Sequence, residues 1–448
     1  MGHDPVGDHG ARVSDVDVAI VGLGPTGAVL ANLCGLYGLR TLVFERSPAP
    51  FAQPRACHLD AEIARVIAQC GLDATELLTV SAGMEFVDDT GRRLFTFEGF
   101  ERAPLLGWHE DYVFVQPELD ALLRSGLDRF EHVEVRLGQS APPVGDLLDV
   151  AELVVGCDGA SSAVRAGIGA TLLDLGYDQE WLVVDLDVEP EVAASLPAII
   201  QQVCDVNRAA TFVPSHGTHR RWEFRLHPGE HPDAWTLLEP WGVSPANARL
   251  LRAAPYRFHA LVADRWRGGP DGRVLIAGDA AHQMPPFMGQ GMCSGIRDAA
   301  GLAWRLAEFV ERTPGRDTLD DYQRERAPHV EAITRLSIEA GQLIDSLAAD
   351  LAAARTPTLP AAADDDPDRW SRIPGLDLGG PFPVGHQVPG PRGLDAQLGL
   401  DWAWVVVDAG FTPPPASRDA KIVHDPRATY GRGAVLVRPD RYIAEVVP

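Results

Sequence analysis

Apolar and polar positions follow two different patterns along the chain, and their succession predicts an α/β protein. Residues 16–21 form a short, almost continuous apolar run, as expected for a buried strand of a parallel sheet. An alanine- and leucine-rich stretch over 25–37 and a second apolar run over 41–44 complete a strand–helix–strand unit. A similar strand is predicted over 274–277, before a helix whose apolar residues continue at helical spacing to Leu306.

The middle and the end of the chain have another pattern. Between 177 and 267, strand-like runs replace the helical pattern. Residues 319–351 are helical in pattern, and Pro328 predicts a break or a kink within them. Beyond a stretch rich in proline, alanine and aspartate, two strands of a small C-terminal cap are expected at 402–407 and 433–443.

The interleaving of the two patterns predicts how the chain divides into domains. A nucleotide-binding domain would be discontinuous, and a β-sheet domain would lie in its insertions, because strand-like runs interrupt the βαβ pattern. The predicted parts are a nucleotide-binding domain (14–82, 110–176 and 268–350), a substrate domain (83–109 and 177–267), a linker (351–379) and a C-terminal segment (380–448).

Charge and composition narrow the classes of partner. The 448 residues carry a net charge of −24, which argues against nucleic acid or an anionic membrane as a partner. No apolar run is long enough for a membrane span and the N-terminus has no apolar signal core, so a cytoplasmic protein is expected. Six scattered cysteines and fourteen histidines form no metal-ligand spacing, so no metal site is predicted.

A glycine-rich turn joins the first predicted strand to its helix. Gly22 permits a tight turn, Gly24 lets the backbone approach a pyrophosphate, and Gly27 lets the helix pack close to the strand. The positive end of the helix points at that phosphate, and Pro25 suits its first turn. Glu45, which ends the next strand, can accept hydrogen bonds from a ribose diol. These residues predict an ADP-binding βαβ unit.

Two later motifs indicate whether the ADP group bound at this turn is part of FAD or of NAD. A middle motif carries Asp158, and a late motif places Asp279 at the end of a predicted strand, where it can bind a ribitol hydroxyl. The amides at Gly289-Gln290-Gly291, which open a helix, can hold the negatively charged pyrimidine end of a reduced flavin. A nicotinamide dehydrogenase needs no such second site. FAD is therefore the predicted cofactor.

The order of the three motifs resembles that of the class A flavoprotein aromatic hydroxylases, which share the p-hydroxybenzoate hydroxylase fold. Within them the chain is most similar to the 3-(3-hydroxyphenyl)propionate hydroxylase branch, over about residues 14–345. The resemblance implies a Rossmann-like FAD-binding domain, an interleaved β-sheet substrate domain and a short C-terminal cap resembling a reduced thioredoxin-like domain. The segments that carry the closer similarity are 53–56, 115–119, 132–136, 180–185, 202–205, 220–224 and 283–298.

The resemblance also implies roles for single residues. Pro286, Gly289 and Gln290 would border the isoalloxazine as the catalytic residues, with the Pro286 carbonyl near the site of oxygen transfer. Arg55 and Gln116 would contact the pyrophosphate and the ribitol. The full set implied in cofactor binding is Gly22, Gly24, Pro25, Thr26, Gly27, Glu45, Arg46, Arg55, Gln116, Asp158, Gly159, Arg165, Gly278, Asp279, Pro286, Gly289, Gly291 and Met292.

The resemblance implies a chemistry as well. NADH or NADPH would reduce the FAD, dioxygen would add to give a flavin 4a-hydroperoxide, and its distal oxygen would attack an electron-rich phenol ring. A 3-(3-hydroxyphenyl)propionate-like substrate is favoured, and the enzyme would be a monomer or a homodimer. Two alternatives stay open: a polyketide or antibiotic tailoring hydroxylase acting on a larger polycyclic phenol, and a non-catalytic FAD-binding protein.

Candidate substrate contacts lie in a hairpin predicted over 213–226. His216 could polarise a phenol, and Arg221 or Arg225 could meet a carboxylate. The same residues are explained as well by a loop histidine and by charges that alternate on a solvated sheet face. The pattern alone does not decide between the two interpretations.

Overall fold

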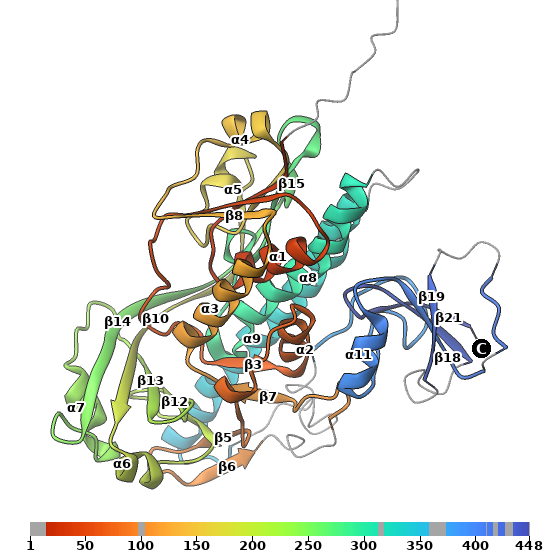
Figure 1. Cartoon of the computed structure of the whole chain (residues 1–448). Coiled ribbons are helices and arrows are strands. Elements are labelled where there is room, and N and C mark those ends of the chain that lie inside the picture. Colours follow the sequence, from red (N-terminus) through yellow and green to blue (C-terminus); the bar gives the residue numbers. More distant parts are fainter. Residues whose placement is uncertain are drawn as a thin grey trace, which may run out of the picture.

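Two large β-sheets and a smaller C-terminal body organise the computed structural model (Figure 1). The structure describes residues 15–96, 104–311, 318–357, 373–408, 410–414, 420–425 and 433–447. The FAD-binding α/β fold predicted from the sequence is confirmed. The predicted domain bounds and the thioredoxin-like nature of the C-terminal cap stay predictions.

The first sheet has six strands in the order β15-β16-β9-β1-β2-β8. All neighbours pair in parallel except the edge strand β15, and the strands are β1 (Val16–Val21), β2 (Thr41–Glu45), β8 (Val133–Leu137), β9 (Ala151–Gly156), β15 (Arg267–Gly268) and β16 (Val274–Ile276). The apolar runs of the four inner strands β16, β9, β1 and β2 are buried, as central parallel strands require, whereas the edge strand β8 is partly exposed. The chain runs from β1 outward through β2 to β8 and then returns to β9 on the other side of β1, so the strand order reverses beside β1 and the carboxyl end of β1 is the expected nucleotide site.

Helices flank this sheet and connect it to the rest of the chain. α1 packs against α8, and α8 packs against α9. α9 runs without a break through Pro328, because its buried side chains are held by tertiary packing despite the missing backbone donor. The helices of the whole described chain, including those outside this layer, are α1 (Pro25–Leu36), α2 (Ala61–Gln69), α3 (Gln116–Ser125), α4 (Val144–Val150), α5 (Ala163–Gly167), α6 (Pro190–Ser195), α7 (Ala234–Leu238), α8 (Gln290–Val310), α9 (Leu319–Ala352) and α11 (Arg392–Leu398).

The second sheet has eight strands in the order β17-β14-β10-β13-β12-β11-β5-β6. Its two long strands, β10 (Leu172–Val188) and β14 (Ala248–Ala263), pair antiparallel and reach from the first sheet into the second (Figure 1). The predicted hairpin is present as β12 and β13. The remaining strands are β5 (Met84–Val87), β6 (Arg93–Thr96), β11 (Ile200–Val203), β12 (Ala210–Val213), β13 (His219–Arg225) and β17 (His282–Gln283). β3 (His58–Asp60), β4 (Thr79–Val80) and β7 (Asp111–Val113) form a separate small sheet.

The C-terminal body contains a four-stranded sheet and helix α11. Both predicted strands are present, and two further strands that were not predicted complete the sheet: β19 (Lys421–His424) and β21 (Ile443–Val447). β18 (Ala403–Val406) and β20 (Ala434–Val437) lie within the predicted ranges. Residues 358–372 of the predicted linker lie outside the described residues.

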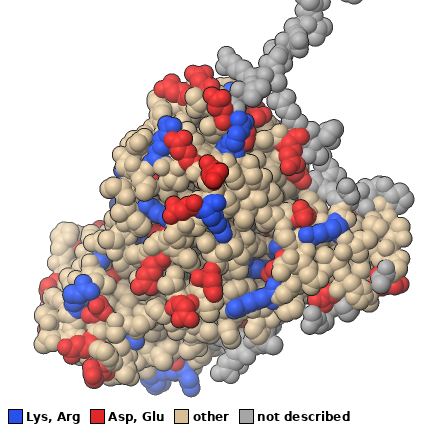
Figure 2. All heavy atoms as spheres, in the orientation of Figure 1, with Lys and Arg blue, Asp and Glu red and all other residues tan. Residues whose placement is uncertain are grey.

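The described surface and interior agree with the composition. Figure 2 shows acidic and basic side chains interspersed over one face rather than gathered in a single patch. Within the described ranges, no helix is long and apolar enough to cross a membrane, and no group of three or more His, Cys, Asp or Glu could hold a metal ion. The six cysteines are unbridged.

Candidate active site

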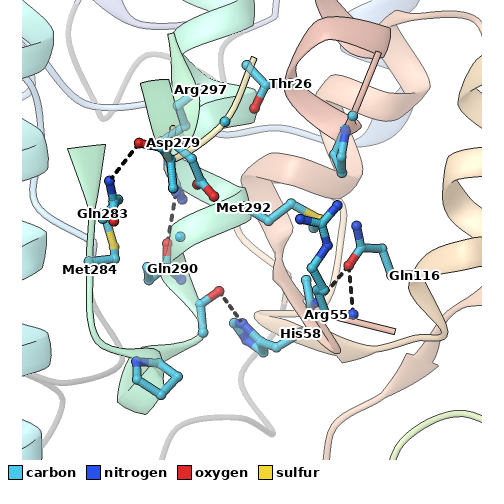
Figure 3. A pocket seen from close by; sticks show the side chains of 18 of the residues that line it. Thr26, Arg55, His58, Gln116, Asp279, Gln283, Met284, Gln290, Met292 and Arg297 are labelled. Atoms are coloured by element: carbon cyan, nitrogen blue, oxygen red, sulfur yellow. Dashed lines mark hydrogen bonds between the residues drawn. The ribbon is translucent and has the colours of Figure 1, made fainter. Parts of the chain in front are cut away.

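A cavity of about 1,940 Å³ lies where the two sheets and the C-terminal body meet. Its walls come from the carboxyl ends of β1, β2 and β9, from the first turn of α8, from one face of the second sheet, and from residues 373–387 and Tyr442 of the C-terminal body. Figure 3 shows part of this lining. The cavity therefore combines the predicted nucleotide site with a second compartment that faces the β-sheet.

The glycine turn has the geometry that a pyrophosphate requires. Gly22 has φ +99°, and a Cβ built on it would lie 2.4 Å from the carbonyl oxygen of Cys157. A Cβ on Gly27 would lie 2.0 Å from the carbonyl oxygen of Gly22, so the helix packs as closely as predicted. Gly24, in contrast, faces open space within the cavity, and no side chain caps α1 there. The backbone near Gly24 is thus free for a phosphate group.

The Glu45 carboxylate closes this turn. Its two oxygens accept hydrogen bonds from the backbone N–H groups of Leu23 and Ser47, each at 2.8 Å. A carboxylate oxygen can accept a second bond, so both oxygens keep acceptor capacity toward a ribose diol. Arg46 is exposed and lines the cavity beside Glu45.

Gln116 fixes the loop that carries Arg55. Its Oε1 accepts from the backbone N–H of Arg55 at 3.0 Å and of Ala56 at 2.7 Å (Figure 3). The Arg55 guanidinium itself is exposed, lies over the Phe51 ring at 4.9 Å and lines the cavity. The position of Gln116 therefore indicates a support for Arg55, which is the residue of the pair that can reach a phosphate.

Asp158 of the middle motif lines the cavity and also holds neighbouring loops together. The Asp158 carboxylate accepts from the Ser162 hydroxyl at 2.5 Å and from the Ala163 amide at 2.7 Å, which caps α5. Arg165 does not line the cavity; it donates to the carbonyl of Ala280 at 2.9 Å and so ties this motif to the late one. Gly159, with φ +83°, lines the cavity.

The late motif turns a carboxylate into the cavity. Gly278 has φ +63°, and a Cβ there would lie 2.7 Å from Thr26 Oγ1, so the turn packs directly on α1. The Asp279 side chain reaches the cavity and has no hydrogen bond to any described residue (Figure 3). The surrounding walls raise the pKa of Asp279 by desolvation. An acceptor without a donor at this place fits a ribitol hydroxyl.

Asp279→Ala is expected to lose most of the bound FAD. A hydrogen bond to a charged group contributes about 1.5–3 kcal/mol, which corresponds to a Kd for FAD about 10- to 150-fold higher. Equilibrium titration followed by flavin fluorescence measures it. Asp279→Asn keeps an acceptor oxygen, so its Kd for FAD should lie between that of the unmodified protein and that of Asp279→Ala. Full flavin absorbance in purified Asp279→Ala would contradict the role.

The loop before α8 depends on the left-handed backbone of Gly289 and on hydrogen bonds made by the side chain of Gln290. Gly289 has φ +63°, and a Cβ there would lie 2.5 Å from His58 Nδ1. The side chain of Gln290 points away from solvent: Oε1 accepts from Arg297 Nη1 at 2.9 Å, and Nε2 donates to Asp60 Oδ2 at 3.1 Å. Pro286, Gly289, Gln290, Gly291 and Met292 all line the cavity.

Two groups at the site were missed from the sequence. His58 forms an ion pair with Asp111 beside the Gly289 loop. Burial lowers the pKa of His58, but the charge of Asp111 opposes this, and the pKa of His58 is raised well above its usual value. Arg124 lines the cavity and donates to the Leu23 carbonyl at 2.9 Å, while its Nε and Nη1 are buried with no hydrogen-bond partner among the described residues. The spacing of eight residues from Gln116, two turns along α3, was the available signal for Arg124.

The three predicted substrate contacts, His216, Arg221 and Arg225, lie in different surroundings. Arg221 lines the cavity, but its guanidinium is occupied by Asp185 at 2.8 Å and by the carbonyls of residues 54 and 55. Arg225 pairs with Asp345 of α9, and His216 hydrogen bonds with the Thr79 hydroxyl at 2.8 Å. Neither Arg225 nor His216 lines the cavity, and their predicted contact with substrate stays a prediction.

A polar row crosses the cavity face of the second sheet. Gln202, Thr211 and Glu223 are cross-strand neighbours on β11, β12 and β13, and all three line the cavity. The Thr211 hydroxyl donates to Gln202 Oε1 at 2.6 Å. Glu223 is buried, approaches Arg221 only to 3.9 Å, and has no hydrogen bond among the described residues. Burial raises the pKa of Glu223, which the Arg221 charge opposes.

Known proteins are similar to this chain in sequence and in fold. The model of the FAD_binding_3 family, an FAD binding domain, matches residues 15–143 and 150–337. A probable NADH-specific resorcinol 4-hydroxylase from Rhodococcus jostii (strain RHA1) is 37% identical over 414 residues, which cover 86% of this chain and 76% of that protein.

A 3-(3-hydroxy-phenyl)propionate/3-hydroxycinnamic acid hydroxylase from Mycolicibacterium smegmatis (strain ATCC 700084 / mc(2)155) is 36% identical over 373 residues. The match covers 76% of this chain but 63% of that protein, so the chain spans less than two thirds of its length. Among solved structures, the rebeccamycin biosynthetic enzyme RebC with reduced flavin matches with a TM-score of 0.76 at 20% identity, over 96% of both chains; this likeness concerns the fold.

Proposed function

The chain belongs to the FAD binding domain family, and from this premise we propose that it is a monooxygenase that hydroxylates a phenolic ring at the expense of NADH or NADPH. The cavity carries the proposal. It joins the loops at Gly24, Asp279 and Gln290, where FAD is expected, to a buried sheet face that bears the carboxylate of Glu223, whose only ion pair among the described residues is the long one with Arg221. A cofactor site that opens directly onto a substrate compartment is what ring hydroxylation requires.

The residues of this chain would do three things around the cofactor. Bound FAD takes reducing equivalents from the nicotinamide and, with dioxygen, supplies the oxygen atom added to the ring. The glycine turn and Asp279 would bind it, and Gln290 would fix the helix end beside it. Glu223 would accept the proton of the phenolic hydroxyl, which makes the ring more electron-rich at the carbons to be attacked.

The substrate we propose is a phenol with a second substituent in the meta position. The names of both relatives support it, since resorcinol and 3-(3-hydroxyphenyl)propionate share this pattern. Arg252 lines the cavity, is buried, and donates to the Pro54 carbonyl at 2.8 Å. Its charge near Glu223 would suit the propionate group, so we retain 3-(3-hydroxyphenyl)propionate as the favoured substrate.

Nicotinamide oxidation by the purified, FAD-loaded protein tests the proposal. We expect 3-(3-hydroxyphenyl)propionate or resorcinol to stimulate NADH or NADPH oxidation and to gain one oxygen atom, as seen by mass spectrometry of the product. The matched control is 3-phenylpropionate, which lacks the hydroxyl and should stimulate poorly. A flavin-loaded protein that no phenol stimulates would overturn the proposed function and leave FAD binding intact.

A further inference from the structure

The C-terminal body forms part of the cavity wall. Phe382, His386, Gln387 and Tyr442 all line the cavity, although they lie more than 300 residues after the glycine turn in the sequence. Two of them, Gln387 and Tyr442, also hydrogen bond to a carboxylate on α2. The body is thus in direct contact with the elements that shape the predicted flavin site.

A continuous chain of hydrogen bonds leads from Tyr442 to the first turn of α8. The Tyr442 hydroxyl donates to Glu62 Oε1 at 2.8 Å, and Arg297 Nε donates to Glu62 Oε2 at 2.7 Å. Arg297 continues to Gln290 Oε1 at 2.9 Å and to Asp60 Oδ2 at 2.6 Å. Figure 3 shows Arg297 and Gln290 joined in this way on α8.

All five residues are buried, with at most 8% of any residue exposed. Hydrogen bonds and charges interact more strongly in such surroundings than in water, and solvent cannot replace a lost partner. A change at Tyr442 therefore acts on Gln290 through groups that have no alternative partner in water.

The charges explain why the chain needs donors from the C-terminal body. Two carboxylates, Asp60 and Glu62, share the single guanidinium of Arg297. Tyr442 and Gln387 Nε2, the latter at 3.0 Å, supply neutral donors to the same oxygen of Glu62. Without these two donors, Arg297 alone would compensate the negative charge of Glu62. The hydrogen bond from Arg297 to Gln290 Oε1 would then be altered.

We propose that Tyr442 is a positioning residue of the flavin site: through Glu62 and Arg297 it sets the place of Gln290 and the electrostatic potential at the N-terminus of α8. The inference rests on the proposed function for its meaning, because Gln290 is expected to border the flavin. It assigns the C-terminal body a part in the active site beyond covering the other domains. Less compensated negative charge near the predicted flavin site would disfavour the electron-rich reduced form of a bound flavin.

The test compares two tyrosines that each give one hydroxyl to the contact between the C-terminal body and the rest of the chain. Tyr442→Phe removes the donor to Glu62. Tyr37→Phe removes a hydrogen bond of 3.0 Å to the Leu400 carbonyl, which leads to no residue of the flavin site. For both FAD-loaded variants, the Kd for FAD, the flavin midpoint potential and the unfolding temperature are measured.

We expect both variants to lose some thermal stability and only Tyr442→Phe to change the flavin. Its Kd for FAD should rise on the order of fivefold, within the range seen for mutations along a coupled network. Its equilibrium constant for flavin reduction should fall on the order of threefold, which is a midpoint potential about 14 mV lower for a two-electron couple.

Equal flavin properties in the two variants would overturn the inference and reduce Tyr442 to a structural contact. The outcome does not depend on hydroxylation, since neither the affinity for FAD nor its potential requires a phenol. A protein that binds FAD but hydroxylates nothing would thus refute the proposed function while the positioning role of Tyr442 is still decided by these measurements.

Discussion

Gly22→Ala is expected to abolish FAD binding in the purified protein. The residue has φ +99°, and a Cβ would lie 2.4 Å from the carbonyl oxygen and 2.8 Å from the carbonyl carbon of Cys157. Those atoms belong to the backbone that leaves β9, a buried central strand, so they cannot move away cheaply. The first and middle motifs would be pushed apart at the point where the pyrophosphate binds.

Gly38→Ala is the matched control for this variant. Gly38 also has a positive φ, +74°, but a Cβ there would meet no atom within 4 Å. Both variants carry the cost of a left-handed alanine, about 1–2 kcal/mol, and only Gly22→Ala adds the collision. The ratio of flavin absorbance to protein absorbance after reconstitution measures the difference. Equal FAD content in the two variants would refute the role assigned to the contact with Cys157.

The nucleotide-binding part could be predicted because its signals are local. The strand over 16–21 is confirmed residue for residue, the helix from Pro25 ends one residue earlier than predicted, and the second strand ends at Glu45 as predicted. An apolar run, a glycine turn and an alanine- and leucine-rich stretch each specify structure over a few neighbouring residues. The order of three such motifs was then enough for the cofactor.

Groups that meet across long distances in the sequence could not be predicted in the same way. Tyr442 and Glu62 are separated by 380 residues, and neither stands in a motif. His58 and Asp111 meet only because β3 and β7 pair in a small sheet whose strands are three residues long. The hydrophobic pattern indicates that a residue is buried and leaves its partner unspecified.

The hairpin of β12 and β13 shows the limit most clearly. The alternation along β13 correctly places Arg221, Glu223 and Arg225 on one face, but what covers that face was not in the sequence pattern. Asp345 of α9 takes up Arg225, whereas Glu223 is left facing the cavity. The more informative residue was thus the acid between the two arginines.

Glu223→Gln is expected to lower kcat for phenol hydroxylation by about 10²- to 10⁴-fold, the usual contribution of a general base. The amide keeps the size of the side chain and a hydrogen-bond acceptor, but it takes up no proton from the phenolic hydroxyl. FAD content and the unfolding temperature should stay near those of the unmodified protein. Thr211→Val, the neighbour in the same polar row, keeps the carboxylate and should change KM far more than kcat.

The pH dependence of kcat separates a proton acceptor from a mere hydrogen-bond partner at this position. Burial raises the pKa of Glu223 above the ordinary value of 4.5, and only the ionised carboxylate can accept the proton. The rate of the unmodified enzyme should therefore fall as the pH falls through that raised pKa. Glu223→Gln should lack this acid limb, because nothing titrates at the position. A variant that keeps both the acid limb and the full kcat would show that the phenolic proton goes elsewhere.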